Sequence, residues 1–244
     1  MITTRHLTAT ACGILFATMS WTQVQAAVAP ETPQQRVANL KAWVQASREQ
    51  MRAYQWIETT TVSVDGEQKS MVEQRCYYGE EGTLVKVPME QTQASEGGQG
   101  IFGVLGAIKE HKKEELVAYI NSAKQLIHEY IPLTAERIQQ ATSNGYMSVQ
   151  VLEPDRKVEV KFANYLKEGD SLAVQVALPT NQLLGMSIAT YLTDDTQDAI
   201  TMNATTSVLP DGTIYVQKIL LDGSSKNVTV AVENGGYQRL SSQR

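Results

Sequence analysis

The segment Gly98-Gln99-Gly100-Ile101-Phe102-Gly103 has the glycine spacing of a dinucleotide-binding fingerprint. Such glycines let the backbone approach a pyrophosphate, but only where the segment directly follows a strand and opens a helix within a strand–helix–strand unit. Here a polar stretch separates the segment from the preceding predicted strand, and antiparallel strands follow. We therefore expect no nucleotide cofactor, and two interpretations remain open: a flexible glycine linker or a movable apolar flap.

In the flap hypothesis, residues 91–106 form an insertion whose glycines permit movement and whose apolar side chains contact a ligand or a partner. The flap residues concerned are Ile101, Phe102, Val104 and Leu105. Other large apolar residues could line the same cavity: Trp43, Trp56 and Met71, together with Met51, Met89 and Met186. Residues of this kind at helical or strand spacing more often belong to an ordinary core, so their number does not decide between a cavity and a core.

Histidine and acidic residues form no recognisable metal site or catalytic group. His111 and His128 fall on different faces of one predicted helix, and His128-Glu129 lacks the second histidine of a zinc-protease helix. The run Asp194-Asp195-Thr196-Gln197-Asp198 lacks the central Gly and closing Glu of a calcium loop, and we interpret it as a solvated hairpin loop. The sequence therefore predicts no metal, no cofactor and no enzymatic activity.

Cys76 could be a reactive thiol because Arg75 flanks it. Val72 and Tyr78 share its parity on the predicted strand, however, and this favours a buried structural thiol. It is the one cysteine left after removal of residues 1–26, so the mature chain can form no internal disulfide.

Residues 1–26 are typical of an export signal. Arg5 is the single fixed charge, an apolar stretch surrounds residues 7–21, and Val24-Gln25-Ala26 suits a signal peptidase. An uncleaved anchor is the alternative, although the apolar run is shorter than the ~20 residues that a spanning helix needs. We expect residues 27–244 to form a single domain, periplasmic or secreted, that acts as a monomer. Its net charge of −5 before cleavage argues against a nucleic-acid partner.

The predicted helices and strands around these residues follow one another in a simple order. Thr32 and Pro33 predict the start of an N-terminal helix, and a helical insertion over residues 107–143 contains helices at about 107–130 and 134–142. Turn clusters such as Pro154-Asp155, Gly169-Asp170 and Asp222-Gly223 separate short Val-, Ile- and Thr-rich pieces, a pattern typical of antiparallel strands. Ten strands are predicted: 56–64, 67–78, 83–89, 146–152, 157–165, 171–178, 183–192, 199–208, 213–221 and 227–233. The fold class is α+β, a curved antiparallel sheet or open barrel with the N-terminal helix and two central helices on its concave face.

This order of elements resembles the outer-membrane lipoprotein carrier (LolA/LolB-like) family. The likeness lies in residues 37–54 leading into 56–64, in Tyr165-Leu166-Lys167-Glu168-Gly169-Asp170, and in residues 208–216. In that family a curved, incompletely closed sheet wraps around helices and leaves an apolar cavity for acyl chains. The resemblance implies an exported, non-enzymatic carrier or binding protein for a lipid, a lipoprotein or another apolar ligand. The alternative is a structural module that docks on an envelope protein or a membrane face through residues 97–106.

Overall fold

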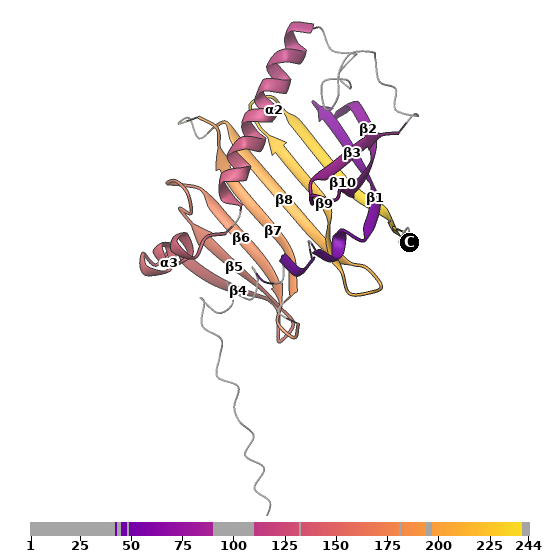
Figure 1. Cartoon of the computed structure of the whole chain (residues 1–244). Coiled ribbons are helices and arrows are strands. Elements are labelled where there is room, and N and C mark those ends of the chain that lie inside the picture. The colour runs from indigo at the N-terminus through magenta and orange to yellow at the C-terminus, as the bar shows by residue number, and fades with distance from the viewer. Residues whose placement is uncertain are drawn as a thin grey trace, which may run out of the picture. The chain divides into compact units, whose positions relative to one another are not determined.

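Short turns separate most of the ten strands in the described part of the computed structural model (Figure 1). The structure describes residues 42, 45–47, 49–89, 110–131, 133–180, 182–193 and 197–240. At the first turn, Asp65 and Gly66 have positive φ angles of 55° and 77°. Two-residue hairpin turns favour Asp-Gly because both central positions need a positive φ. The sequence therefore sets this hairpin locally.

The elements fall into three consecutive groups. Three strands come first: β1 (Tyr54–Val64), β2 (Glu67–Tyr78) and β3 (Leu84–Pro88). Two helices follow: α2 (Glu110–Tyr130) and α3 (Ala135–Ser143). Seven strands complete the chain: β4 (Met147–Glu153), β5 (Lys157–Ala163), β6 (Ser171–Ala177), β7 (Gln182–Tyr191), β8 (Ala199–Val208), β9 (Ile214–Gly223) and β10 (Val228–Arg239). The described residues between 42 and 51 are also helical.

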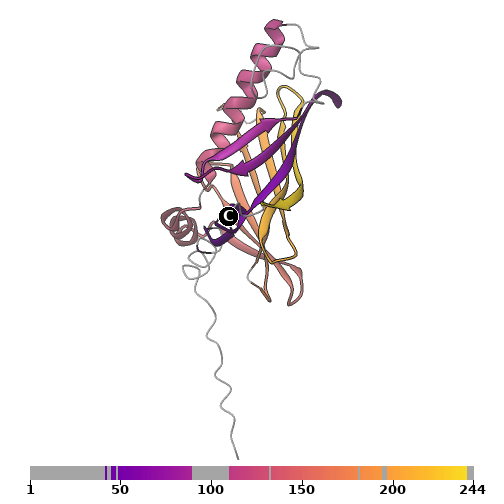
Figure 2. The ribbon, with the colours of Figure 1, turned by 45° about the vertical axis from the view of Figure 1, so that its right-hand side comes forward.

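All ten strands belong to one antiparallel sheet with the order β3-β2-β1-β10-β9-β8-β7-β6-β5-β4. The first and last strands pair along their length, from Tyr54 opposite Arg239 to Val64 opposite Val228. Among the described strands, β3 and β4 each have one neighbour, so the sheet is open. Figure 2 shows that the sheet bends around the side on which α2 lies. The α+β class and the open sheet of about ten antiparallel strands are confirmed.

One predicted turn is wrong. Asp222-Gly223 ends β9 as paired strand residues, and Gly223 lies opposite Val228 in β10 and Ile200 in β8. The reason for the glycine is space, since a Cβ there would lie 2.5 Å from the Tyr119 ring on α2. Gly223 thus lets the helix approach the sheet, and the hairpin turn follows it.

The short helix α3 ends where the sequence predicts. The Thr134 side chain accepts a hydrogen bond from the Arg137 backbone N–H at 3.4 Å and caps the first turn. Asn144 closes the last turn, and Gly145 follows with a φ of 72°. This cap chemistry explains why the helix ends three residues before β4.

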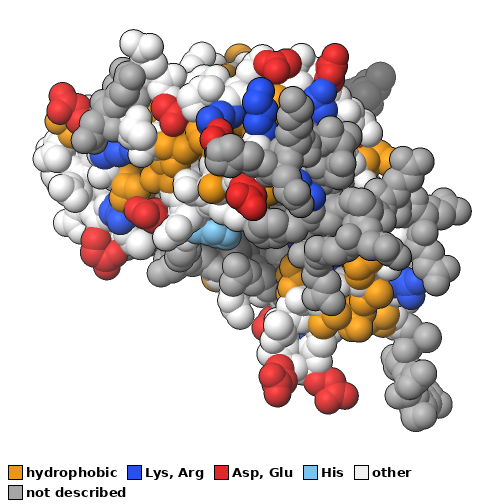
Figure 3. All heavy atoms as spheres, turned by 90° about the horizontal axis from the view of Figure 1, so that it is seen from above, with side chains coloured by type: hydrophobic (Ala, Val, Ile, Leu, Met, Phe, Trp, Pro, Cys, Tyr) orange, Lys and Arg blue, Asp and Glu red, His pale blue; other side chains and the backbone are white. Residues whose placement is uncertain are grey.

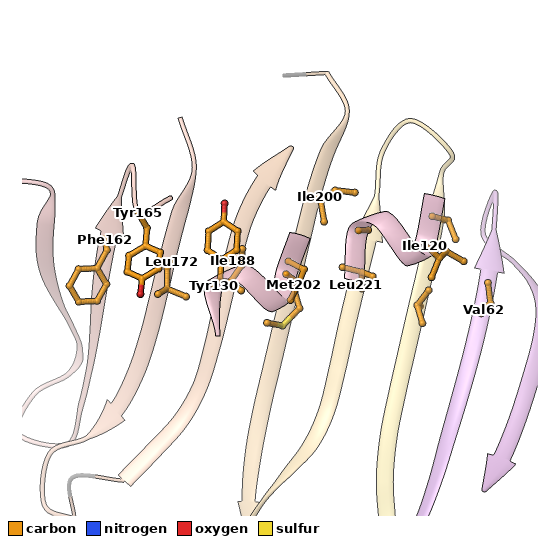
Figure 4. Packing of buried hydrophobic residues seen from close by; sticks show 14 of the residues in the cluster. Val62, Ile120, Tyr130, Phe162, Tyr165, Leu172, Ile188, Ile200, Met202 and Leu221 are labelled. Carbon is orange, nitrogen blue, oxygen red and sulfur yellow. The ribbon is translucent and has the colours of Figure 1, made fainter. Parts of the chain in front are cut away.

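The core lies between α2, α3 and one face of the sheet, here called the inner face. Val117, Ile120 and Ala123 of α2 are almost completely buried against it. Figure 4 shows this packing, with Ile120 and Tyr130 above side chains from successive strands. Fully burying a side chain of this size contributes about 1.5–3 kcal/mol. The position of α2 on the sheet is thus set mainly by the apolar side chains along one side of the helix.

The chain divides into two units, Met1–Glu31 and Thr32–Arg244, and every described residue lies in the second. The predicted signal, residues 1–26, and the proposed flap, residues 91–106, lie outside the described residues.

Two strand glycines should respond oppositely to alanine. A Cβ at Gly185 in β7 would lie 2.7 Å from the Ala204 carbonyl oxygen in β8, whereas a Cβ at Gly235 in β10 meets open space. Neither glycine has a positive φ. We expect Gly185→Ala to lower the free energy of unfolding by about 1–3 kcal/mol through overpacking. Gly235→Ala should raise it by about 0.4–1 kcal/mol. Urea unfolding checks both, and equal effects would contradict the close approach at Gly185.

Candidate functional site

The strand register arranges the inner-face side chains in rows that cross the sheet. The first row lies beneath the helices and contains Met147, Phe162, Leu172, Ile188, Met202, Leu221, Val230 and Val62. The second row contains Val149, Val160, Val174, Met186, Ala204, Ile219 and Val232. A shorter third row contains Val151, Val158, Val176 and Leu183. Apolar side chains therefore extend along the sheet in both directions.

The first row is a closed core. Leu172, Ile188 and Met202 are at most 3% exposed, and all three belong to the cluster that α2 and α3 cover (Figure 4). Side chains packed this tightly leave no room for a ligand. This row holds the fold together and does not form the site.

The second row, which we call the apolar strip, is different. Val160, Met186 and Ile219 touch the core cluster but are only partly buried, as are Ala204 and Val232. Val174 is buried at 5% exposure. The strip thus has one side against the core while most of its members keep contact with solvent.

At β4 the second and third rows reach the surface. Val149 and Val151 are 58% and 60% exposed, and both lie on the inner face. Seen from above, the molecule has hydrophobic side chains at its surface in separate areas among charged ones (Figure 3). Neighbouring exposed apolar side chains such as Val149 and Val151 often mark a binding surface. The inner face of β4–β10 is therefore the candidate site.

The other end of the inner face carries an aromatic cluster made of Trp56, Tyr78, Tyr215 and Tyr237. The Trp56 and Tyr237 rings stack with centroids 5.8 Å apart, and the Tyr215 and Tyr237 centroids are 4.3 Å apart. Met51 and Cys76 pack against Trp56. The Trp56 Nε1–H donates to Asn234 Oδ1 at 3.0 Å. These contacts satisfy and fix the indole, so this cluster is a second, smaller core.

Glu58 interrupts the apolar alternation of β1 and still lies on the inner face, 8% exposed. Its Oε1 accepts a hydrogen bond from the Lys86 ammonium of β3 at 2.5 Å. A buried carboxylate needs such a partner because loss of hydration is costly. The pair places two charged groups at the β1–β3 end of the face, which also carries the aromatic cluster.

A buried polar network fixes the end of α2 to the sheet. The Tyr130 hydroxyl donates to Asp170 Oδ2 at 2.6 Å, and the Thr190 hydroxyl lies 2.8 Å from the Tyr130 oxygen. Asp170, 2% exposed, also accepts from the backbone N–H groups of Tyr165, Leu166 and Lys167. These bonds tie the segment Tyr165–Asp170, which links β5 and β6, to the end of α2. Burial, and then the hydrogen bond to Asp170, raise the pKa of the Tyr130 phenol.

This shift predicts a loss of stability in alkali. A group with a raised pKa in the folded state stabilises below its unfolded pKa, about 10 for tyrosine, and loses that contribution as the pH rises further. Stability should therefore fall above about pH 10. Tyr130→Phe should cost about 1–2 kcal/mol at pH 7 and show a shallower decline above pH 10. Urea unfolding at several pH values checks this, and identical slopes in both proteins would contradict it.

Cys76 is fully buried, and the predicted structural thiol is confirmed. Burial raises its pKa to about 11. A thiol in this state is neutral at pH 7 and a poor nucleophile.

The described residues contain no group of three His, Cys, Asp or Glu side chains placed to hold a metal ion. In the same part of the chain, no helix has both the length and the hydropathy required to cross a membrane.

Comparison with known proteins gives structural neighbours alone. No family model and no curated protein matches the chain. A DUF1329 family protein from Desulfovibrio piger has a similar structure, with 8% sequence identity, a TM-score of 0.40, and coverage of 86% of this chain and 93% of that chain. A LolA superfamily protein from Nitrosomonas europaea has 8% identity and a TM-score of 0.35, covering 82% and 93%. The superfamily suggested by the element order thus occurs among the structural matches. Both TM-scores are below 0.5, so these likenesses assign no family, ligand or role to this chain.

The structure separates two of the predicted site residues. Trp56 is 6% exposed on the inner face, whereas Met71 pairs with Thr61 on the opposite face and is 48% exposed. The other predicted site residues lie outside the described residues, namely Trp43, Ile101, Phe102, Val104 and Leu105. Their role stays a prediction.

Most of the apolar strip was missed by sequence reasoning, although Met186 was a candidate. Val160, Ile219 and Val232 alternate with polar residues, and this alternation identifies a strand face. It does not tell which part of that face a helix covers. The signal that could have found the strip was the combination of this alternation with the hairpin registers.

Proposed function

We propose that this chain is an exported, non-enzymatic carrier or binding protein that holds the hydrocarbon part of a lipid or lipoprotein along the apolar strip. The observation that carries the proposal is the partial burial of Val160, Met186 and Ile219 beside a closed core. An inner face built for packing alone would have these side chains covered as fully as Ile188, two residues from Met186. The proposal thus rests on the difference in burial between the first row and the apolar strip.

The chemistry of the strip suits an elongated apolar ligand. Neighbouring strands lie about 4.8 Å apart, so seven positions across seven strands extend over roughly 29 Å. Every member of the strip is an aliphatic or thioether side chain. Covering each 100 Å² of such surface contributes about 2.5 kcal/mol. Affinity would therefore come from apolar burial, without a required polar contact.

The flap belongs to the same proposal. Ile101, Phe102, Val104 and Leu105 would cover the bound hydrocarbon, with Trp43 contributing from the N-terminal helix, and the glycines of residues 97–106 would allow entry and release. The export signal would place the protein in the periplasm or outside the cell, where it would act without a metal or cofactor.

The test uses two adjacent residues of β9 that face opposite sides of the sheet. Ile219 is in the strip, and Leu220, which is also half-buried, pairs with Asn203 and Ala231 on the outer face. Native mass spectrometry of protein purified from its own envelope should show co-purified lipid, and the apolar fluorophore 1-N-phenylnaphthylamine should bind saturably. Ile219→Thr should weaken fluorophore binding at least fivefold, whereas Leu220→Thr should leave it unchanged. Absence of both lipid and a saturable site would overturn the proposal.

A second experiment distinguishes a carrier from the alternative, a docking module. If the protein is a carrier, replacing Ile101 and Phe102 with Ser should reduce the amount of ligand that it retains. The variant should still bind its envelope partners in a pull-down. Loss of partner recovery with no ligand detected in the unmodified protein would instead favour docking on a protein or membrane face.

A further inference from the structure

The two edges of the sheet are built differently. β3 has five residues, among them Lys86 and Pro88, and lysine and proline at an edge hinder pairing with another chain. β4 has seven residues, and its first six, Met147–Leu152, contain no charge and no proline. In the described part of the chain, β4 has β5 as its single neighbour. One edge therefore carries devices against pairing, and the other lacks them.

The two most exposed large hydrophobic side chains among the described residues lie on the inner face at the unprotected edge. Val149 and Val151 are 58% and 60% exposed, whereas Val158, opposite Val151 on β5, is 6% exposed. Leu152, on the same strand, is 36% exposed. An open strand edge with exposed valines readily pairs with another strand. The β4 edge therefore exposes both unpaired backbone groups and apolar side chains to water.

We propose that β4 pairs with β4 of a second copy, antiparallel and in the register centred on Gln150. This register places Val149 opposite Val151 of the second copy, and Val151 opposite its Val149. This register is centred on the strand and uses residues 149–151, which precede the irregularity between Val151 and Glu153. Directly opposite residues in such a pair have Cα atoms about 4.5–5.5 Å apart, which brings the valines into contact.

The sequence of the strand points to a second copy as the occupant. Val149-Gln150-Val151 reads the same in both directions, so a two-fold axis through Gln150 makes a self-complementary interface. The absence of charge over Met147–Leu152 gives nothing that would select a charged peptide. With the axis perpendicular to the sheet, both inner faces lie on the same side, and the apolar strips of the two copies become continuous. A dimer would replace the monomer expected from the sequence.

Cysteine cross-linking tests the register. Gln150 and Ser148 are both exposed and lie on the outer face of β4. Gln150→Cys should form a disulfide-linked dimer under mild oxidation, because the two thiols meet at the axis and suit disulfide geometry. Ser148→Cys should not, because its copies are offset by four residues, roughly 14 Å. Cys76 is buried and does not compete. Equal cross-linking of both variants, or of neither, would overturn the register.

Charge exchange tests the pairing itself by sedimentation. The double variant Val149→Lys with Val151→Lys should be monomeric, and so should Val149→Glu with Val151→Glu, since like charges would face each other. Mixing the two in equal amounts should restore a dimer, and circular dichroism should show that each variant is folded. An unmodified protein that stays monomeric up to millimolar concentration would overturn the proposal, as would lysine variants that still dimerise. Ligand binding is not measured here, so failure of the dimer leaves the proposed function untouched.

Discussion

Replacing Asp170 with alanine should lower the free energy of unfolding by about 3 kcal/mol or more. The substitution removes the acceptor of three backbone N–H groups and one of the two hydrogen-bond partners of the buried Tyr130 hydroxyl. Each buried donor that loses its partner costs about 1–3 kcal/mol, and Asp170 is 2% exposed, so water replaces it poorly. The end of α2 should then detach from the segment Tyr165–Asp170. Urea unfolding followed by circular dichroism measures the loss.

A matched control lies on the same helix. The Tyr119 hydroxyl donates to Asp198 Oδ1 at 2.7 Å, again a tyrosine of α2 bonded to a loop carboxylate, but in a partly exposed position. Asp198→Ala should cost only about 1 kcal/mol, because water can reach the freed hydroxyl. Equal losses in the two variants would show that burial of Asp170 is not the source of its effect.

A double-mutant cycle separates the pair from its surroundings. Tyr130→Phe and Asp170→Ala should be non-additive by about 0.5–3 kcal/mol, since they share one hydrogen bond. Additive losses would mean that Asp170 acts through the backbone N–H groups alone.

Local chemistry explains how much of the fold could be predicted from the sequence. Asp65-Gly66 and Gly145 act through their own φ angles, so the first hairpin and the end of α3 follow from a few neighbouring residues. Asp222-Gly223 has the same turn composition but serves a distant contact, the approach of Tyr119. No local rule distinguishes a glycine needed for a turn from one needed for a neighbour.

The site was harder to predict because it depends on long-range pairing. Strand alternation places Trp56 and Glu58 on one face and, through β2, puts Met71 on the other. It gives no information on which face the helices cover. That choice depends on long-range pairing such as that of β1 with β10, which joins residues 54–64 to residues 228–239. The boundary between closed core and apolar strip therefore emerges only when the whole sheet is assembled.

Two residues of β7 should reveal that boundary directly. Ile188 and Met186 share a strand and a face, but Ile188 is 1% exposed in the first row and Met186 is half-buried in the strip. Ile188→Ala should lower the free energy of unfolding by about 2–5 kcal/mol, because it opens a cavity in a packed core. Met186→Ala should cost about 1 kcal/mol, since it removes a contact on one side only.

The effects on ligand binding should run in the opposite order. A ligand present at a hundredfold excess over its Kd stabilises the folded protein by about 2.7 kcal/mol. With a fluorescent fatty acid as probe, this stabilisation should persist in Ile188→Ala, because the first row does not contact the ligand. It should shrink by at least half in Met186→Ala, whose side chain would lie against the hydrocarbon. Thermal unfolding with and without the probe measures both. If Met186→Ala retains the full stabilisation, the probe binds elsewhere and the apolar strip is part of the core.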